Sequence, residues 1–362
     1  MKPFLKLFIS FLSIAILMTV VNSSALSAGA TVVVNDGQYE YTYTDGAWTL
    51  YSYIGNDNEI TLPTTYAGSQ VRRIGDNCFA SGGLTSVTIP QGYTSIGEYA
   101  FENCAVLSEL SIPSSISEIG EGAFKGTSID SLDLSGNKLA EIAAFTFKDC
   151  SLLGEVSLPK SLVRIGESAF CDSGIEHLNI PGKITKLEAN TFKNTSSLES
   201  VDLPPHLIEI GAGCFENSAL NAINLPDMLA TIGDSAFKNA FSLSQLYIPN
   251  SVSSIGAYAL YPMSTQSRIE VTCFENSYAE EYCYENFVKN LKTYAYIIGD
   301  ADLSGKVSIS DATLIQKYKA GLKEITNPCA RILCDANRDE TISVRDATLI
   351  QMRLAEIITD FE

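Results

Sequence analysis

Residues 74–113 read IGDNCFASGGLTSVTIPQGYTSIGEYAFENCAVLSELSIP and contain one pattern twice. Each copy begins with an Ile-Gly pair, at Ile74 and again at Ile96, and has a phenylalanine five residues later. A second motif of the form L-x-x-V-x-I-P follows, and in the second copy it reads LSELSIP. A pattern that returns after 22 residues is typical of a repeat protein, so further copies are expected along the chain.

The pattern occurs nine times at a spacing of 22 or 23 residues. We call the first residue of each copy its marker, and the markers are Ile74, Ile96, Ile119, Ile142, Ile165, Leu187, Ile210, Ile232 and Ile255. Five residues after each marker there is a phenylalanine, except in the last copy, which has Leu260. These are Phe79, Phe101, Phe124, Phe147, Phe170, Phe192, Phe215 and Phe237.

Each copy predicts one short strand, one turn and one segment whose phenylalanine points inward. In the motif that ends at Ile89-Pro90, apolar residues two apart favour a strand with one buried face, and the proline ends the strand because it cannot donate to a ladder. A unit of this size cannot bury its own apolar face, so neighbouring units must stack. The predicted fold class is a repeat solenoid with a parallel β-sheet along one side and a ladder of Leu, Ile and Phe inside.

One copy departs from this regularity. The distance from Ile129 to the marker Ile142 is thirteen residues instead of twelve, and Ser135-Gly136 stands where the proline is expected. We therefore predict a small bulge at Ser135-Gly136.

The repeated pattern closely resembles the leucine-rich repeats of bacterial surface proteins that are called BspA-like. The resemblance covers about residues 71–262, as nine units. It implies short helical or turn segments between the strands. It also implies a surface that recognises proteins, host cells or neighbouring cells.

Both ends of a solenoid need caps. Residues 31–70 are predicted to form an N-terminal β-hairpin, because Tyr39, Tyr41 and Tyr43 alternate, Asp45-Gly46 turns the chain, and Tyr51 and Tyr53 return opposite them. Residues 263–298 are the predicted C-terminal cap, with a strand at 268–271 and a short helix at 277–286.

Residues 1–30 are a predicted secretory signal peptide. Lys2 and Lys6 precede an apolar run, and Ala28-Gly29-Ala30 fits an A-x-A cleavage site, with Ala25 as the alternative. No second apolar run approaches the ~18 residues that a membrane span needs. We therefore expect an exported, extracellular protein with no membrane insertion, attached to a cell or complex only through its C-terminal end.

The net charge limits the classes of partner, and the cysteine positions indicate which cysteines could form disulfides. The formal net charge is −18, which argues against nucleic acid and anionic lipid as partners. Of the nine cysteines, Cys78 and Cys214 occupy a slot that is elsewhere alanine, and Cys104 and Cys150 one that is elsewhere threonine or serine, which predicts buried small residues. Two disulfides stay open as possibilities, namely Cys273 with Cys283 and Cys329 with Cys334.

Near the C-terminus, two twelve-residue loops of related sequence lie 35 residues apart. Residues 300–311 read DADLSGKVSISD, residues 335–346 read DANRDETISVRD, and each runs into the sequence DATLIQ. Calcium takes six to eight oxygen ligands, and such a loop supplies them from positions 1, 3, 5, 7, 9 and 12. The predicted ligands of the first site are Asp300, Asp302, Ser304, the carbonyl of Lys306, Ser308 and Asp311, and those of the second are Asp335, Asn337, Asp339, the carbonyl of Thr341, Ser343 and Asp346.

The two loops differ at position 6, where a glycine usually makes the sharp turn. The first loop has Gly305, whereas the second has Glu340. A residue with a side chain costs about 1–2 kcal/mol in a left-handed conformation, so the second calcium site is predicted to be the weaker one.

The residues that precede the first loop, TYAYIIG, favour extended structure, so each loop is expected to have only its exiting helix. This duplicated half-hand closely resembles the type I dockerin module of cellulosomes, over residues 299–362. The resemblance implies a small all-α domain of two F-hands that docks, in the presence of calcium, onto a cohesin domain of a scaffoldin. The positions that match the cohesin contacts of the family are Ile309, Ser310, Gln316, Lys317, Val344, Arg345, Gln351 and Met352. The alternative is a pair of solvated turns, or calcium that only holds the chain end together.

Ser310 and Arg345 stand at equivalent positions of the two copies but differ in charge and size, as Lys317 and Met352 do. We therefore expect one preferred docking orientation rather than two equivalent ones.

The outward positions of the predicted sheet form a polar, mildly acidic surface. The candidate recognition residues on it are Glu109, Asp133, Glu155, His177, Asn179, Asp202 and Tyr247. A row of aromatic side chains of the kind that stacks on sugar rings is missing from this surface. Trp48, Tyr41 and Tyr43 of the hairpin are the one candidate platform, although hairpin pairs that cover the end of the solenoid explain them better.

No catalytic residues are predicted. His177 and His206 both stand at repeat positions, and neither lies in a metal-binding spacing or near a candidate nucleophile. The sequence thus favours a secreted, non-catalytic cellulosome component. Its dockerin would bind a scaffoldin, and its repeats would present a protein-recognition surface in the context of plant polysaccharide degradation. The alternatives are a cell-surface adhesin and a polysaccharide-binding module.

Overall fold

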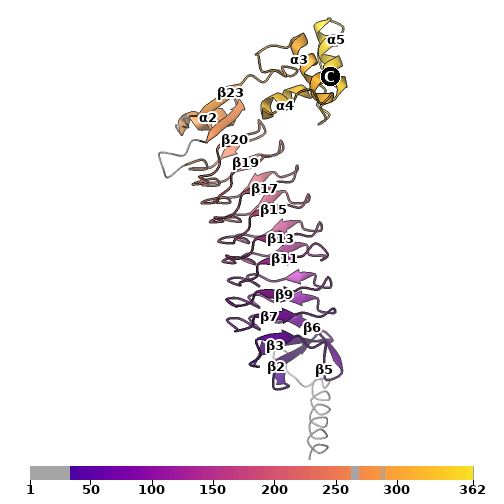
Figure 1. Cartoon of the computed structure of the whole chain (residues 1–362), viewed down its shortest axis with the longest axis vertical. Helices are drawn as coiled ribbons and strands as arrows, with labels where there is room; N and C mark the ends of the chain where they lie inside the picture. Colours follow the sequence, from indigo (N-terminus) through magenta and orange to yellow (C-terminus); the bar gives the residue numbers. More distant parts are fainter. Residues whose placement is uncertain (1–32, 262–268, 287, 289, 362) are drawn as a thin grey trace, which may run out of the picture. The chain divides into compact units, whose positions relative to one another are not determined.

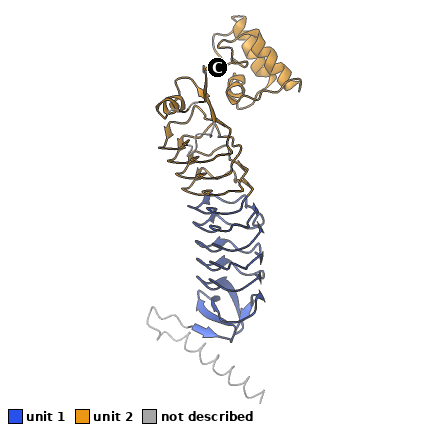
Figure 2. Ribbon diagram, turned by 60° about the vertical axis from the view of Figure 1, so that its left-hand side comes forward, with its two compact units in different colours: residues 1–175 blue, residues 176–362 orange. Residues whose placement is uncertain are grey.

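A computed structural model describes residues 33–261, 269–286, 288 and 290–361 of the chain (Figure 1). The predicted signal peptide and part of the predicted C-terminal cap, residues 263–268, lie outside these ranges. The chain divides into two compact units, residues 1–175 and 176–362 (Figure 2). No helix within the described ranges has the length and apolar character needed to cross a membrane.

The N-terminal hairpin is present in the first unit. Strands β1 (Val33–Asn35), β2 (Tyr39–Thr44) and β3 (Ala47–Tyr53) pair antiparallel, and Asp45 and Gly46 both have positive φ, as a two-residue hairpin turn requires. Tyr53 lies opposite Tyr39 as predicted. Tyr51, however, is exposed and does not face a tyrosine, because a register shift at Glu40/Tyr41 brings Leu50 opposite Tyr41.

The repeats form two parallel ladders of short strands, and each ladder is described within its own unit. The predicted ladder consists of three-residue strands at the centres of the L-x-x-V-x-I-P motifs, preceded by one strand before the first marker. One motif has no strand, and there Ala222 forms only a single bridge to Ser200. The strands are β4 (Glu59–Thr61), β7 (Ser86–Thr88), β9 (Glu109–Ser111), β11 (Ser131–Asp133) and β13 (Glu155–Ser157) in the first unit, and β15 (His177–Asn179), β17 (Ser200–Asp202) and β20 (Gln245–Tyr247) in the second. The predicted repeat solenoid is confirmed.

The second ladder was not predicted. Its strands end at the markers: β6 (Ser69–Ile74), which also pairs with β5 (Thr65–Tyr66), then β8 (Ser95–Ile96), β10 (Glu118–Ile119), β12 (Glu141–Ile142) and β14 (Arg164–Ile165) in the first unit, and β16 (Lys186–Leu187), β18 (Glu209–Ile210), β19 (Thr231–Ile232) and β21 (Ser254–Ile255) in the second. Most of these strands have two residues, which is too short for an alternating pattern to be recognised.

The phenylalanines five residues after the markers stack inside the solenoid. In the first unit the ring centroids of Phe79, Phe101, Phe124, Phe147 and Phe170 follow one another at 4.9, 5.6, 5.7 and 5.4 Å, with interplanar angles of 8–15°. In the second unit Phe192, Phe215 and Phe237 stack at 5.5 and 5.4 Å. Each ring is at most 3% exposed, so the row forms the centre of the core.

Two positions of the copies adopt a left-handed backbone, three and seven residues after the marker; in the last copy only the first of the two lies within the described residues. Only three of these residues are glycine, and the others include Asn77, Asn103, Asp149, Asn190 and Asn217, but also Tyr99 and Phe145. Asn and Asp adopt this conformation more readily than most residues. The backbone N–H of Tyr99 and that of Asn103 donate to the carbonyls of Glu121 and Lys125 in the next copy, at 2.8 and 2.7 Å. Stacking therefore holds even the bulky residues in this conformation.

The extra residue near Ser135-Gly136 lies in a turn, so the predicted bulge is wrong. Strand β11 ends at Asp133, its pairing with β13 has no register shift, and the Asp133 carboxylate accepts from the N–H of Ser135 at 2.9 Å. The side chain of Asn137 is buried and donates to the carbonyls of Pro113 and Ile116, at 2.9 and 3.0 Å. The insertion thus satisfies carbonyls of the preceding copy without disturbing the ladder.

Beyond the last marker, strand β22 (Glu270–Phe274) pairs with β20 and is followed by helix α2 (Tyr278–Glu285) and strand β23 (Leu291–Tyr294). The predicted strand and helix are both present, and Ser277 caps α2 by accepting from the N–H of Glu280. Helices α3 (Ile309–Lys319), α4 (Pro328–Cys334) and α5 (Val344–Leu354) then form a small helical module. Its core contains Ala312, Ile315, Ala330, Ala347 and Ile350.

All nine cysteines lie in the described part of the chain, where they are buried and none forms a disulfide. Cys78 and Cys214 share the core slot of Ala100 and Ala236, as predicted. The thiols of Cys104 and Cys150 donate to the carbonyls of Phe79 and Phe124, both at 3.0 Å, while the hydroxyl of Thr127 in the same slot donates to the carbonyl of Phe124 at 2.9 Å. The cysteines replace alanine and threonine in the core.

Candidate metal loops and recognition surfaces

The first loop, residues 300–311, gathers carboxylates around a common centre. Ligand oxygens of Asp300, Asp302 and Asp311 lie within 4.8 Å of one another. The Asp300 carboxylate accepts from the N–H groups of Ser304 and Gly305, at 3.0 and 2.8 Å. The Asp311 carboxylate accepts from the N–H groups of Asp302 and Ser308, at 2.9 and 2.7 Å, and therefore ties the two ends of the loop together.

The second loop, residues 335–346, repeats this network. The Asp335 carboxylate accepts from the N–H groups of Asp339 and Glu340, at 3.1 and 2.7 Å. The Asp346 carboxylate accepts from the N–H groups of Asn337 and Ser343, at 3.3 and 2.8 Å. Two loops that are only partly alike in sequence thus fold by the same four contacts.

Position 6 of both loops has the left-handed backbone that was predicted for it. Gly305 has φ +82° and Glu340 has φ +65°, so the glutamate adopts the conformation that favours glycine. Position 4 is also left-handed, at Leu303 (φ 58°) and Arg338 (φ 57°), which the sequence did not indicate. The lower affinity of the second site stays a prediction.

The ends of the loops also start the exiting helices. Ser308 and Ser343 are the N-caps of α3 and α5, and each forms a capping box with the aspartate three residues later. The signature S-x-x-D was present in both copies and could have revealed this second role of positions 9 and 12.

The second loop has an entering helix, contrary to the prediction of exiting helices alone. Helix α4 ends directly before Asp335, and Asn327 caps its start through a side-chain oxygen that accepts from the N–H of Ala330. Asn327 followed by Pro328 at the first helical position is a recognised start signal that was missed. The first loop has no entering helix, as expected: strand β23 ends at Tyr294, and a turn at residues 298–299 leads into the loop.

Burial and neighbouring carboxylates both act on the first aspartate of each loop. Burial, together with the nearby Asp311 and Asp302, raises the pKa of Asp300 above its usual value. Burial raises the pKa of Asp335 in the same way, with Asp346 and Asp339 adding to it. A divalent cation would relieve this repulsion, and a donor set made only of oxygen suits calcium or magnesium rather than zinc.

Six of the eight residues that match family cohesin contacts are exposed. Ile309 and Val344, at equivalent positions of the two copies, are 59% and 56% exposed. Ser310, Gln316, Lys317 and Arg345 are exposed as well, whereas Gln351 and Met352 are half-buried.

The outward row of the predicted ladder is exposed, with one exception. Glu109, Asp133, Glu155, His177, Asn179 and Asp202 all face solvent, and the His177 ring lies 2.8 Å from the hydroxyl of Ser200. Tyr247 is half-buried and packs against the cluster of Phe274, Cys329 and Leu333, so it is not a free surface residue. The hairpin aromatics are not a platform for sugars either, because Tyr41 and Trp48 are 0% and 4% exposed and pack with Tyr66 at the end of the repeats.

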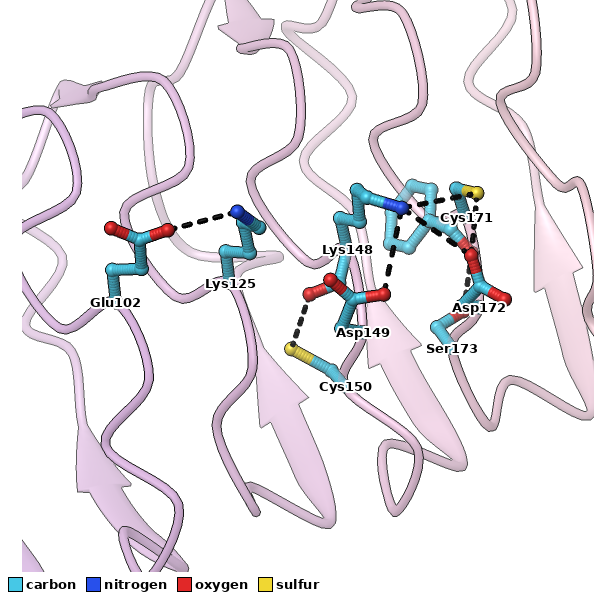
Figure 3. Close-up of polar contacts among 9 residues, drawn as sticks. Glu102, Lys125, Lys148, Asp149, Cys150, Cys171, Asp172 and Ser173 are labelled. Carbon is cyan, nitrogen blue, oxygen red and sulfur yellow. Dashed lines mark hydrogen bonds and ion pairs between the residues drawn. The ribbon is translucent and has the colours of Figure 1, made fainter. Parts of the chain in front are cut away.

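Six residues after the marker, most copies have a charged side chain, which the sequence pattern had not indicated: Glu102, Lys125, Lys148, Lys193, Glu216 and Lys238. Lys125 pairs with Glu102 at 2.8 Å in the first unit (Figure 3). Further along, Lys148 lies 3.5 Å from Asp149, 3.4 Å from Asp172 and 3.7 Å from the sulfur of Cys171, which donates to Asp172 at 2.9 Å (Figure 3). We call these residues and their equivalents the charged row.

The charged row continues in the second unit as a three-residue ion-pair series. Glu216 accepts from Lys193 at 2.8 Å and from Lys238 at 3.0 Å. Burial by itself raises the pKa of Glu216, but the hydrogen bonds from the two lysines outweigh it and hold the pKa below its usual value. The next position along carries an amide ladder in which Asn239 donates to Asn217, and Asn217 to Asn194, both at 2.8 Å.

The stacked copies, with their two ladders and phenylalanine row, match a known family. The family model described as "BspA type Leucine rich repeat region" matches residues 72–199 and 185–299, in six copies. The chain belongs to the BspA-type leucine-rich repeat family.

The chain also matches solved structures of leucine-rich repeat proteins at low identity. A leucine-rich cell surface protein from Faecalibacterium prausnitzii is 22% identical, with a TM-score of 0.36, and the match covers 78% of this chain and 100% of that one. A leucine-rich repeat protein from Bacteroides ovatus is 21% identical, with a TM-score of 0.30, over 72% of this chain and 99% of that one. The leucine-rich repeat protein of T. pallidum is 18% identical, with a TM-score of 0.33, over 72% and 97%. Comparison with curated proteins gave no significant match.

The BspA-type match ends at residue 299, directly before the first loop. The two loops and helices α3 to α5 therefore lie beyond the family segment, and their function has to be argued from their own geometry.

Proposed function

We propose that this BspA-type protein is an exported, non-catalytic component of a cellulosome-type complex. Its C-terminal module would bind two calcium ions and dock as a type I dockerin onto a cohesin of a scaffoldin. Its repeats would present a surface that recognises another protein, in the context of plant polysaccharide degradation. The signal-peptide pattern of residues 1–30 and the cell-surface description of the F. prausnitzii protein support an extracellular location.

The observation that carries the proposal is the duplicated loop network. Two loops 35 residues apart place a carboxylate at positions 1 and 12, accept the same backbone N–H groups with them, and make the same left-handed turn at position 6. Loops that serve only as solvated turns have no need of a position-1 aspartate whose pKa is raised by burial, as at Asp300 and Asp335. Calcium coordination would explain both the acid cluster and the geometry that the two loops share.

The exposed apolar residues at the start of α3 and α5 support a protein partner for the module. Ile309 and Val344 stand at equivalent positions and remain open to solvent beside Ser310 and Arg345. Protein interfaces commonly have apolar centres with polar rims. This arrangement fits a docking surface that exists in two copies.

The deciding experiment is calorimetric titration of the mature chain with a panel of cohesins, in calcium and again in EDTA. Tight binding to one cohesin that is lost in EDTA is the expected result. The variant with Asp300→Asn and Asp335→Asn should lose binding, while Glu324→Gln, an exposed carboxylate outside both loops, should bind as the unaltered chain does. If no cohesin binds but calcium still raises Tm, the module only stabilises the chain end, and the adhesin function becomes the better account.

The docking orientation can be tested with the same assay. Exchange of the two residues, Ser310→Arg together with Arg345→Ser, should lower affinity for the cognate cohesin if one orientation is preferred. Unchanged affinity would show that the two orientations are equivalent.

The recognition role of the repeats needs a separate assay. Beads carrying the mature chain should capture a defined protein from culture supernatant, and Glu155→Lys with Asp202→Lys on the exposed row should reduce the capture. Adhesion to whole cells would instead favour the adhesin, and depletion by insoluble cellulose or xylan would favour a polysaccharide-binding module.

A further inference from the structure

Helix α4 is buried on two sides, and the two sides belong to different hydrophobic clusters. Ala330 and Cys334 lie in the core of the C-terminal module. Cys329 and Leu333, both 0% exposed, pack instead with Phe274 at the end of strand β22. One short helix therefore belongs to the core of the module and to the end of the repeat region at once.

Aromatic residues from the last strands form the other half of this contact. The Phe274 ring lies edge-on to Tyr296 at 4.8 Å and to Tyr247 at 6.5 Å. Tyr247 occupies the outward row of the ladder, where Asp133 and Asn179 are exposed in other copies. Its hydroxyl group is buried and has no hydrogen-bond partner among the described residues, which shows how closely the contact covers it. The end of the repeat sheet is thus covered by the module.

The contact is connected to the second loop through the backbone. The N–H of Gly299 donates to the carbonyl of Leu333 at 2.8 Å, which holds the connecting segment against the last turn of α4. Helix α4 ends at Cys334, and its C-cap residue, Asp335, is the first predicted ligand of the second loop. A cation bound by Asp335 would therefore fix the end of the helix that carries Leu333.

We propose that the C-terminal module is the cap of the repeat region, and that calcium binding to its second loop stabilises the last strands, β20, β22 and β23. A ligand that binds only the folded form stabilises every element that unfolds together with its site. The ends of a repeat array are its weakest part unless they are capped. This inference rests on the calcium binding of the proposed function, but it does not depend on a cohesin.

Hydrogen exchange of the full-length mature chain tests the coupling. Calcium should slow the exchange of backbone amides in β20 and β22 by about tenfold relative to EDTA, in addition to its effect on α3 and α5. Leu333→Ala removes most of the side chain that packs on Phe274 but removes no predicted calcium ligand. In this variant calcium should slow exchange in β20 and β22 by less than about threefold, while its effect on α3 and α5 persists. Leu322→Ala, which alters a leucine of the same module that is 77% exposed, is the matched control and should behave as the unaltered chain.

Phe274→Ala approaches the contact from the repeat side and leaves the module intact, so it tests the coupling even if Leu333→Ala unfolds α4. It should also uncouple calcium from β20 and β22. If calcium protects α3 and α5 of the unaltered chain but leaves β20 and β22 unchanged, the cap proposal is wrong and the calcium sites stand. If calcium protects neither region, the calcium sites and the cap proposal both fail.

Discussion

The repeat region and the C-terminal module both reuse a sequence pattern, but they constrain it differently. In the repeats each residue stacks on its own equivalent, as the phenylalanine row and the Asn194, Asn217 and Asn239 ladder show. In the module the two loops fold alike while their surroundings differ, since the first follows strand β23 and a turn and the second follows α4. In the repeats, neighbouring copies hold each residue in its conformation. Each loop of the module is held by its own hydrogen bonds. Bulky residues such as Tyr99 and Phe145 adopt a left-handed conformation in the repeats, which is consistent with support from neighbouring copies.

The largest effect is expected from the phenylalanine row. Phe147→Ala removes a ring that is stacked on both sides, and it should lower the free energy of unfolding of the repeats by about 4 kcal/mol because it leaves a cavity in the core. Urea unfolding followed by tyrosine and tryptophan fluorescence measures the loss. The matched variant Phe361→Ala, in the core of the module, should shift the repeat transition far less than Phe147→Ala does. If both variants lowered the free energy of unfolding of the repeats equally, stacking between copies would not be the main source of their stability.

The second effect concerns the aspartate that closes each loop. Asp346→Ala removes the acceptor of two backbone N–H groups and of the Ser343 hydroxyl, and should destabilise the module by about 2 kcal/mol even without metal. Thermal unfolding in EDTA, followed by far-UV circular dichroism, checks this. Asp346→Asn keeps one oxygen acceptor and should lose less. Asp311→Ala should cost a similar amount, because the networks of the two loops match.

The third test concerns position 6, where the expected change in stability has opposite signs in the two loops. Glu340→Gly should stabilise the second loop by about 1 kcal/mol, because glycine adopts φ +65° without steric strain. Gly305→Glu should destabilise the first loop by a similar amount. In calcium titrations, Glu340→Gly should show a higher affinity at the second site, and Gly305→Glu should show a lower affinity at the first. Two unchanged affinities would mean that the turn does not limit binding.

The smallest effect is expected in the charged row. Glu216→Gln removes two ion pairs and should lower stability by about 0.5 kcal/mol at neutral pH. The pKa of Glu216 is held below its ordinary value of 4.5, so its contribution is present above that pH and is lost as the pH falls through the lowered pKa. The difference between the unaltered chain and Glu216→Gln, measured by urea unfolding at several pH values, should therefore shrink on acidification. A difference that does not change with pH would exclude a charge effect.

The sequence predicted those parts of the structure that depend on periodicity. The strand at Val87, the buried row that includes Phe124 and the turn at Asp45-Gly46 each follow from a local pattern of apolar residues or from a turn signal. The twelve-residue spacing similarly located both loops, and the carboxylates of Asp300, Asp302 and Asp311 do gather around one centre.

What the sequence did not predict depends on contacts between different segments of the chain. A strand of two residues, such as Glu118–Ile119, has no pattern of its own and forms because the neighbouring copy offers a partner. Asn137 fills its place because carbonyls of the preceding copy lie within reach. The burial of Tyr247 depends on Leu333, which is far away in sequence. Local sequence signals carry no information on such contacts.

The unpaired cysteines give the molecule a set of built-in reporters. Cys78, Cys104, Cys150, Cys171 and Cys214 lie in different copies, and Cys329 and Cys334 lie in the module, all of them buried. A thiol reagent can reach each one only when that part of the chain opens, and burial raises the pKa of the thiols, which slows the reaction further. The order in which the native chain is labelled would therefore map, copy by copy, where its opening begins.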